Sequence, residues 1–332
     1  MSRLVPTTDG IVVLRPPAPV DERLLIAGRD AEFHRWLGPG SDRPEPTACI
    51  VVEGEVVGWV DADPSRASLL SGEVNLGYNV FARHRGRGLA SRAVQLLLHH
   101  LAVRTRHRTA TLLIDPANER SLALASRTGF APVGEVDGQR SFQRPLPPLT
   151  YSDGVVTIRM PRPEDLDADL AAKDDEQIDW LWLPGQRERW RAMSELERRA
   201  HALRGLQADQ DGFGTGPTWT FAVDTRDAEY VASVHCDLAN EHVPSGEANV
   251  SFAAHPAHRG HGHVSRAVRL VLRFLHDHTG AREAHIVVEA ENTASLRVAR
   301  AVGAAVTERW VNEGGHTMLR HVVPRGQAWS SG

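Results

Sequence analysis

This 332-residue sequence is short of cysteine, of net charge and of long apolar runs, and each shortage excludes a class of protein. Its two cysteines, Cys49 and Cys236, predict a protein of the reducing cytoplasm. A formal net charge of −4 gives no basic excess, so duplex nucleic acid is not an expected partner. The longest apolar stretch, residues 94–103, is interrupted by His99-His100 and is too short for a bilayer. The first ten residues lack the pattern of a signal peptide, so no membrane association is expected.

What the chain does contain is a long internal repeat. The string His84-Arg85-Gly86-Arg87-Gly88 recurs 174 positions later as His258-Arg259-Gly260-His261-Gly262. The two copies align without a gap from residue 75 to residue 129, but their N-terminal stretches align at an offset of 144. The second copy therefore holds about thirty more residues before its glycine turn. A repeat of this length predicts two tandem domains, residues 1–146 and 151–326, with a proline-rich connector between them.

The hydrophobic patterns predict the elements of each domain. In the first copy we expect one helix over residues 20–36, a hairpin at Glu53-Gly54-Glu55 and a third β segment at residues 73–81. A long helix over residues 89–104 and a short one over 118–127 follow the glycine turn. The second copy repeats this order and adds a helical segment, residues 185–217, in which residues 188–210 predict one or two helices. Strands with helices on both faces indicate an α/β (α+β) layered fold.

The glycine turns suggest that the protein binds a phosphate-containing ligand. Each follows a strand and opens a helix, so its N–H groups are left unpaired and, with the helix dipole, form a site for a pyrophosphate. No Gly-Lys-Ser/Thr sequence follows either turn, which excludes a phosphate-loop ATPase. Neither turn supplies the third glycine of the dinucleotide-binding pattern. The expected ligand is a nucleotide cofactor of another kind.

Two motifs carry a resemblance to a known family. Arg83-His84-Arg85-Gly86-Arg87-Gly88 resembles the Arg/Gln-x-x-Gly-x-Gly/Ala loop of the Gcn5-related N-acetyltransferases (GNAT family). Asn118-x-x-Ser121, followed by Gly129-Phe130, is similar to the matching helix of the ribosomal-protein N-acetyltransferase branch. The resemblance implies two tandem domains, each with a splayed, mixed but mostly antiparallel sheet that binds acetyl-coenzyme A. It implies an acyltransferase that acetylates a primary amine of a small molecule or of a protein N-terminus, as a monomer or homodimer.

The resemblance also assigns the coenzyme contacts to the end of one strand, the turn, the start of the next helix and an asparagine. In the first copy these are Tyr78, Val80, Arg83, His84, Arg85, Gly86, Arg87, Gly88, Leu89, Ala90, Asn118 and Ser121. In the second copy they are Ala254, His258, Arg259, Gly260, His261, Gly262, His263, Val264, Asn292 and Ser295. The glycines let the backbone approach the phosphates, and Arg85 and Arg87 would add positive charge. The histidines around the second turn suggest zinc, but they straddle a phosphate-type turn, so no metal is expected.

Amine acetylation needs a base and an acid. An alkylammonium has a pKa of roughly 10.4 and must lose a proton before it attacks. The aligned carboxylates Glu73 and Glu247 are the candidate bases. Many relatives protonate the leaving thiolate with a tyrosine seven residues after the asparagine, where this chain has alanine in both copies. Ser121 and Ser295, which match a serine of the ribosomal-protein branch, are therefore the candidate acids.

The missing tyrosines leave alternatives open. One is a non-catalytic sensor or scaffold that binds acyl-coenzyme A. Another is a tandem aminoacyl transferase that draws on charged tRNA, although this chain keeps both pyrophosphate turns. The second copy departs further from the loop pattern, with Ala257 at the Arg/Gln position and Val264 in place of Ala90. The first copy is therefore expected to be the better coenzyme site.

Overall fold

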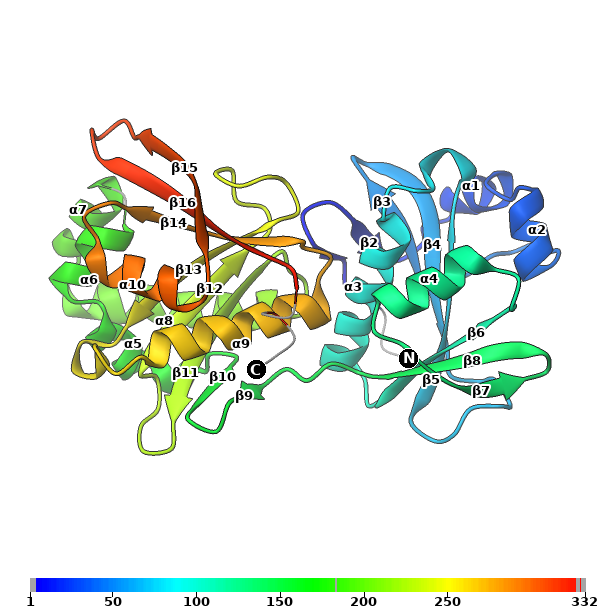
Figure 1. Ribbon diagram of the computed structural model, residues 1–332, viewed down its shortest axis with the longest axis horizontal. Helices are drawn as coiled ribbons and strands as arrows, with labels where there is room; N and C mark the ends of the chain where they lie inside the picture. Colours follow the sequence, from blue (N-terminus) through cyan, green and yellow to red (C-terminus); the bar gives the residue numbers. More distant parts are fainter. Residues whose placement is uncertain (1–3, 183, 327–328, 330–332) are drawn as a thin grey trace. The chain divides into compact units, whose positions relative to one another are not determined.

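A computed structural model describes residues 4–182, 184–326 and 329 (Figure 1). Contacts within the chain divide it into two compact units. Unit 1 comprises residues 1–148 with 277–280, and unit 2 comprises residues 149–276 with 281–332. None of the described helices combines the length and the apolar character that a bilayer crossing requires.

Each unit is built on one eight-stranded sheet. The strands of unit 1 are β1 (Thr7–Thr8), β2 (Val13–Arg15), β3 (Ala48–Val52), β4 (Glu55–Asp63), β5 (Glu73–Val80), β6 (Thr109–Ile114), β7 (Ala131–Val136) and β8 (Gln139–Pro145). Those of unit 2 are β9 (Tyr151–Ser152), β10 (Val156–Arg159), β11 (Thr218–Thr225), β12 (Ala232–Asp237), β13 (Ala248–Ala254), β14 (Glu283–Glu289), β15 (Ala305–Val311) and β16 (Thr317–Pro324). The strand order is β1-β2-β3-β4-β5-β6-β8-β7 in unit 1 and the equivalent β9-β10-β11-β12-β13-β14-β16-β15 in unit 2. The repeat seen in the sequence is thus a repeat of topology.

The helices flank these sheets. Unit 1 has α1 (Asp21–Ala27), α2 (Ala31–Leu37), α3 (Leu89–Arg104) and α4 (Glu119–Arg127). Unit 2 has α5 (Leu166–Ala172), α6 (Asp175–Leu181), α7 (Pro184–Ala192), α8 (Glu195–Phe213), α9 (His263–His278) and α10 (Thr293–Ala301). Three short 3-10 helices, η1 (Ala82–His84), η2 (Pro163–Asp165) and η3 (Pro256–His258), complete the described elements. The predicted fold class, two tandem mixed sheets flanked by helices, is confirmed.

In each sheet one neighbouring pair of strands is parallel and splays apart. Residues 73–75 of β5 pair with residues 109–111 of β6, and residues 248–249 of β13 pair with 284–285 of β14. Among the described residues this ladder ends there, although β5 and β13 continue to the glycine turns. From residue 76 in β5 and residue 250 in β13, one edge of the strand therefore has no strand partner. This is the splayed sheet that the family resemblance implied.

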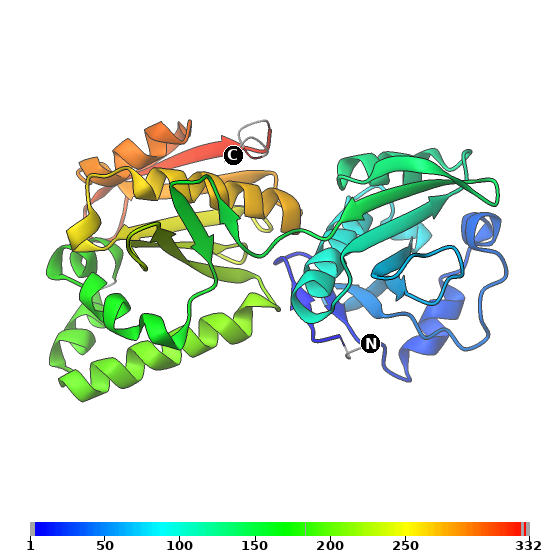
Figure 2. The same ribbon diagram turned by 90° about the horizontal axis from the view of Figure 1, so that it is seen from below.

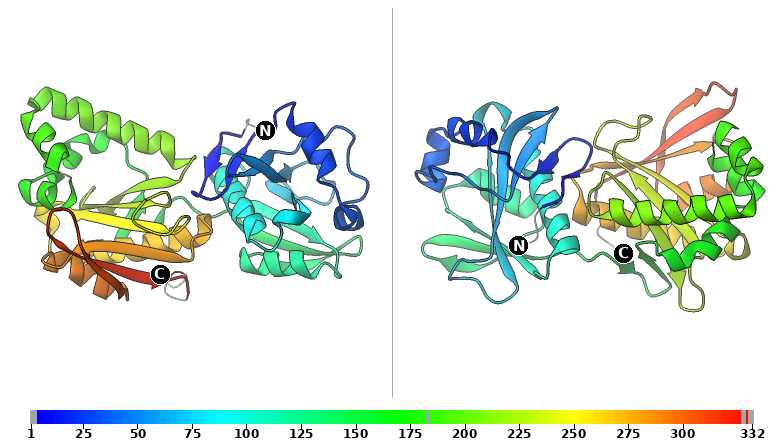
Figure 3. Two further views of the ribbon diagram at one scale, coloured as in Figure 1. Left: turned by 90° about the horizontal axis from the view of Figure 1, so that it is seen from above. Right: turned by 180° about the vertical axis from the view of Figure 1, so that it is seen from behind.

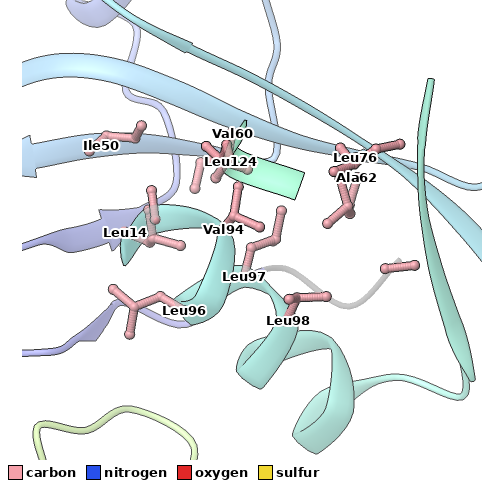
Figure 4. Packing of buried hydrophobic residues seen from close by; sticks show 14 of the residues in the cluster. Leu14, Ile50, Val60, Ala62, Leu76, Val94, Leu96, Leu97, Leu98 and Leu124 are labelled. Atoms are coloured by element: carbon pink, nitrogen blue, oxygen red, sulfur yellow. The ribbon is translucent and has the colours of Figure 1, made fainter. Parts of the chain in front are cut away.

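The helix after the first glycine turn forms the core of unit 1. Leu89, Ala93, Leu97 and Leu101, whose spacing predicts one apolar face, are all at most 3% exposed. The helix packs against β1, β2, β4 and β5. Figure 4 shows Leu97 on the side of α3 that faces Val60 of β4. Because α3 is anchored by this packing, the turn at its N-terminus is held on a rigid element.

The other face of the unit 1 sheet packs on α1. Leu25 of α1 forms a second cluster with Cys49 and Val51 of β3 and with Phe81, whereas Ile50 of β3 belongs to the α3 cluster. This alternation is the period of two that a strand buried on both faces shows. In unit 2, α8 and α9 likewise lie on opposite faces of the sheet (Figure 2, Figure 3). Each sheet is therefore covered on both sides.

The prediction of one helix over residues 20–36 is wrong. The structure has two helices there, because α1 ends at Gly28 and the chain restarts at Asp30. Asp30 is extended, with φ −106°, and its carboxylate accepts a hydrogen bond from the N–H of Phe33 at 2.9 Å. Aspartate is among the preferred N-cap residues, so it begins α2 in its own right. The restart places Asp30 and Glu32 at a helix start, which bears on the glycine turn below.

The additional segment of unit 2 is helical, as its charged and periodic sequence predicts. It contains most of α7 and all of α8. A capping box begins α8, because the Ser194 hydroxyl accepts from the N–H of Glu197 and the Glu197 carboxylate accepts from the N–H of Ser194. These helices belong to unit 2 alone, since unit 1 has a short connection from α2 to β3.

Candidate functional site

The two glycine turns have the same backbone shape. Gly86 and Gly88 have φ of +78° and +77°, and Gly260 and Gly262 have +80° and +76°. Residues that carry a side chain rarely adopt this backbone conformation, so glycine is the residue that fits it. No described atom lies within 4 Å of the point where a Cβ would stand on Gly86 or Gly260. Both turns therefore face open space.

The N–H groups of these turns are available to a ligand. Within the described residues, no hydrogen bond is donated by the backbone N–H groups of residues 86–91 or 260–265. The first helical bonds start at Arg92, which donates to Gly88, and at Arg266, which donates to Gly262. Unpaired N–H groups at the start of a long helix are an anion-binding arrangement. Both repeats therefore have the unpaired N–H groups at a helix start that the sequence predicts.

The side chain of Arg85, predicted to add charge to the phosphates, is committed elsewhere. It donates to Asp30 at 2.6 and 2.9 Å, to Glu32 at 2.8 Å and to the carbonyl oxygen of Val80 at 2.8 Å. Hydrogen bonding to Arg85 lowers the pKa of Asp30 to about 2. The guanidinium therefore fixes the start of α2 and the end of β5 to the turn, and the backbone of the turn remains for a ligand.

Unit 2 makes the same contact. Arg259 donates to Asp174 and to Glu176, both at 2.7 Å, and hydrogen bonding to Arg259 lowers the pKa of Asp174. We call each arginine with its two carboxylates the turn latch: Arg85 with Asp30 and Glu32, and Arg259 with Asp174 and Glu176. Its presence in both units shows that the turn is positioned by the same device twice.

The other two arginines of the first turn, Arg83 and Arg87, differ in whether their side chains already have partners. Arg83 pairs with Glu55 and donates from Nε to Nε2 of His84 at 2.9 Å, so its charge is also engaged. Arg87 is exposed and forms no hydrogen bond or ion pair within the described part of the chain. Its equivalent in unit 2 is the exposed His261. The first turn therefore has a permanently charged side chain at a place where the second has a histidine.

Asparagine caps the helix beyond the splayed strands in both units. The Oδ1 of Asn118 accepts from the N–H of Ser121 at 3.1 Å, and the Oδ1 of Asn292 accepts from the N–H of Ser295 at 3.0 Å. Burial raises the pKa of Tyr78 on β5, and the neighbouring Ser121 hydroxyl opposes that shift. The structure thus brings Tyr78, Asn118 and Ser121 together beside the open edge of β5.

Comparison with known proteins decides the family. The profile of the acetyltransferase (GNAT) domain matches residues 12–131 and again residues 156–305. The chain belongs to the GNAT acetyltransferase family. It carries two such domains in tandem, and as a member of this family it is an acyltransferase whose acetyl donor is acetyl-coenzyme A.

Solved structures are similar to about half of this chain each. A GNAT-family acetyltransferase from Bacillus anthracis is 12% identical, with TM-score 0.41, over 53% of this chain and 98% of its own. RimJ from Mycobacterium smegmatis, in complex with CoA-disulfide, is 19% identical, with TM-score 0.42, over 52% of this chain and 82% of its own. RimL, a ribosomal L7/L12 alpha-N-protein acetyltransferase in complex with coenzyme A, is 14% identical, with TM-score 0.41, over 53% and 97%. A search of curated proteins found no significant match.

Substitutions of Asn118 can separate its structural role, the capping of α4, from the coenzyme contact that we expect its amide to make. Asn118→Asp keeps an oxygen that caps α4, so thermal stability is expected to stay unchanged. It removes the amide donor, and one lost hydrogen bond of about 1 kcal/mol corresponds to an increase of about fivefold in KM for acetyl-coenzyme A. Asn118→Ala is expected to lower stability by about 1 kcal/mol as well. Steady-state kinetics and thermal unfolding measure both; an unchanged KM in Asn118→Asp would show that the amide does not contact the coenzyme.

The two candidate bases have structural partners. Glu73 accepts from the N–H of Leu70 at 2.9 Å and from the side-chain amide of Gln143 at 2.7 Å. Glu247 accepts from the N–H groups of Arg282 and Glu283 at 2.6 and 2.7 Å. Glu73 is the first residue of β5, and Glu247 directly precedes β13. Both lie at the end where β5 still pairs with β6 and β13 with β14. These hydrogen bonds give both carboxylates a role in holding loops together.

The histidines around the second turn do not gather as metal ligands. The rings of His255 and His258 are 5.5 Å apart, as are the stacked rings of His261 and His263. Among the described residues, no three of these histidines bring their ring nitrogens within 4.8 Å of one another. Burial lowers the pKa of both His255 and His263, with neighbouring positive groups adding to the shift. The lowered pKa values favour the neutral forms of His255 and His263 beside the second turn.

Proposed function

We propose that this protein transfers the acetyl group of acetyl-coenzyme A to a primary amine of a small molecule or of a protein N-terminus. The observation that carries the proposal is the pair of glycine turns, whose N–H groups are unpaired and which end strands with one open edge. The turn would hold the diphosphate, and the open edge of the strand would hold the extended arm of the coenzyme. The bound coenzyme supplies a thioester carbonyl that an amine can attack.

We propose further that unit 1 is the better transferase of the two. Its turn has the exposed Arg87, and the phenol of Tyr78 lies beside the hydroxyl of Ser121. In unit 2 the equivalent positions hold His261 and Phe252, so Ser295 has no phenol beside it. Charge on the phosphates and a hydroxyl beside the leaving sulfur both favour unit 1.

Thiol release tests this function. The full chain is mixed with acetyl-coenzyme A and, separately, with N-terminal peptides, aminoglycosides and polyamines. We expect release to depend on the amine, and the same peptide with an acetylated N-terminus is the matched control, because it lacks only the nucleophile. Mass spectrometry of the acceptor then identifies the new amide. Tight binding of acetyl-coenzyme A without release in any mixture would contradict the proposal.

That contrary outcome corresponds to the second candidate function, a sensor or scaffold that binds acyl-coenzyme A. The observation behind it is that Ala125 and Ala299, which stand where many relatives have the acidic tyrosine, are both fully buried. The side chain at this position points into the core of each unit, so the usual acid is lacking in both.

A further inference from the structure

Both units hold a titratable side chain against a threonine, which is Thr47 just before β3 in unit 1 and Thr220 of β11 in unit 2. In unit 1 the hydroxyl and the N–H of Thr47 donate to one carboxylate oxygen of Asp61, at 2.9 and 3.0 Å. In unit 2 the hydroxyl of Thr220 lies 3.0 Å from Nδ1 of His235. Asp61 lies on β4 and His235 on β12, the strands next to the splayed β5 and β13 (Figure 1).

Strand register shows that Asp61 and His235 occupy one position of the repeat. Asp61 pairs with Gly77 of β5, and His235 pairs with Ser251 of β13. Gly77 and Ser251 are equivalent at the offset of 174 that aligns the glycine turns. Asp61 and His235 are themselves 174 residues apart, but they differ in type and lie before the stretch, residues 75–129, over which the two copies align without a gap.

This position lies beside the start of the splay. Asn75 is the last residue of β5 that pairs with β6, and Asn249 is the last residue of β13 that pairs with β14. Gly77 and Ser251 lie two residues further along these strands. A Cβ added at Gly77 would stand 3.8 Å from the Cβ of Asp61. The ring of Trp59 lies 3.5 Å from the same point, and Gly77 adds no side chain of its own beside Asp61. Asp61 and His235 are both half-buried rather than enclosed.

The two side chains also point to the same face of their sheets. Val60 and Ala62, the neighbours of Asp61 on β4, pack in the α3 cluster, so Asp61 points to the opposite face. Thr220, which contacts His235, donates to Asp209 of α8, and α8 lies opposite α9 (Figure 2). Ser121 in unit 1 is on α4, which packs with α3. Asp61 and Ser121 therefore approach the open edge of β5 from different sides.

Hydrogen bonding leaves a proton acceptor in each unit. The Thr47 groups bind Oδ1 of Asp61, and Oδ2 has no hydrogen bond within the described residues. Thr220 donates to Oδ1 of Asp209 at 2.9 Å, so its oxygen accepts from Nδ1–H of His235. This fixes the tautomer with a lone pair on Nε2. Burial lowers the pKa of His235, against the opposing charges of Asp209 and Asp237, so the ring is neutral at pH 7.

We propose that Asp61 and His235 are the general bases of unit 1 and unit 2, each taking a proton from the amine acceptor. The assignment rests on the proposed function. The base takes one proton from R–NH₃⁺, and the nitrogen lone pair of R–NH₂ then forms the C–N bond at the thioester carbonyl. The C–S bond breaks with its electron pair on sulfur. A second N–H proton passes to that sulfur, in unit 1 by way of Ser121, and the base releases its proton to water. The products are the amide and the coenzyme A thiol.

The assignment gives the two units different acceptors and different pH responses. The carboxylate of Asp61 attracts a cationic amine, whereas neutral His235 does not. His235 acts only when deprotonated, so unit 2 activity is present above the lowered pKa of His235 and is lost as pH falls through it. The groups that face this ring are Asp209 from α8, Thr220 from β11 and Asp237 on its own strand.

Kinetics of the full chain test the assignment one unit at a time. Gly260→Trp is used to disable the second turn and Gly86→Trp the first. In the Gly260→Trp background, Asp61→Asn is expected to lower kcat/KM by about 10² to 10⁴. In the Gly86→Trp background, His235→Gln is expected to do the same and to abolish the acidic limb of the pH profile. Coenzyme binding by calorimetry is expected to stay unchanged in both.

One control substitution lies on the same strand as Asp61, and the other replaces a histidine of the same unit as His235. Asp63→Asn lies two residues along β4 on the same face, and His242→Gln is an exposed histidine of unit 2; both should retain kcat/KM within about twofold. Retention of activity by Asp61→Asn or His235→Gln, or loss confined to Glu73→Gln or Glu247→Gln, would overturn the assignment while the function stood. No release from the Gly86→Trp background with any amine would remove His235 as a base. No release from the unmodified chain would overturn the proposed function together with it.

Discussion

Replacement of Gly86 by tryptophan is expected to weaken binding of acetyl-coenzyme A to unit 1 by at least about 100-fold. A Cβ built on Gly86 meets nothing within 4 Å, and we expect the indole attached to it to cover the unpaired N–H groups of the turn. A diphosphate would lose two or more charge-assisted hydrogen bonds, each of about 1.5–3 kcal/mol. A loss of about 3 kcal/mol corresponds to a factor of about 10² in Kd. Isothermal titration calorimetry in the Gly260→Trp background measures it.

Gly138→Trp is the matched control for backbone strain. Gly138 has the same φ, +78°, also has no atom within 4 Å of a built Cβ, and lies in the turn between β7 and β8. Both substitutions force a side chain into the left-handed region at a cost of about 1–2 kcal/mol, but this one should leave coenzyme affinity unchanged. Gly86→Trp is also expected to reduce turnover more than Gly260→Trp does. Equal losses from the two substitutions would refute the asymmetry between the units.

Replacement of Phe274 by alanine is expected to destabilise unit 2 by about 4 kcal/mol. The Phe274 ring, on α9, is fully buried. Its centroid lies 4.8 Å from that of Phe221, 5.6 Å from Trp219, 5.8 Å from Phe213 and 6.3 Å from Tyr151. Truncation of a buried phenylalanine costs about 3–5 kcal/mol, because the contacts are lost and a cavity remains. Urea unfolding followed by tryptophan fluorescence measures the change.

The control for that measurement is a surface leucine. Leu196, near the start of α8, is 78% exposed, so Leu196→Ala is expected to change stability by less than about 0.5 kcal/mol. A change below about 1 kcal/mol for Phe274→Ala would mean that the other four rings collapse into the vacated space, and that the cluster is not a rigid support for α9.

The sequence predicts those parts of the site that depend on local conformation. The glycine turns were predictable because positive φ at Gly86 and Gly260 requires glycine, and the helix at Asn118 because asparagine is a preferred N-cap. The long helix was predictable because the apolar spacing of α3 matches one buried face. These signals lie within a few residues of what they determine.

The contacts across strands could not be predicted in this way. Asp61 and His235 share the offset of 174, but they differ in type, and the pairing of β4 with β5 and of β12 with β13 is what places both beside the splayed strand. The turn latch joins segments that align at two different offsets, which hides it from a single alignment. A signal was nevertheless present, since Asp30 and Glu32 match Asp174 and Glu176 at the N-terminal offset of 144. The break after Gly28 that exposes these carboxylates is set by a cap rather than by apolar spacing.

The turn latch lets the two ends of each domain vary independently. Asp30 and Arg85 are 55 residues apart in the sequence, whereas Asp174 and Arg259 are 85 apart, yet both pairs form. The entropy of closing the longer segment is greater by only about 0.4 kcal/mol for a flexible chain. New helices can therefore be inserted upstream of the turn almost without thermodynamic penalty. An ancestral duplicate could remodel its amine-facing half by insertion while the phosphate-facing half kept its shape.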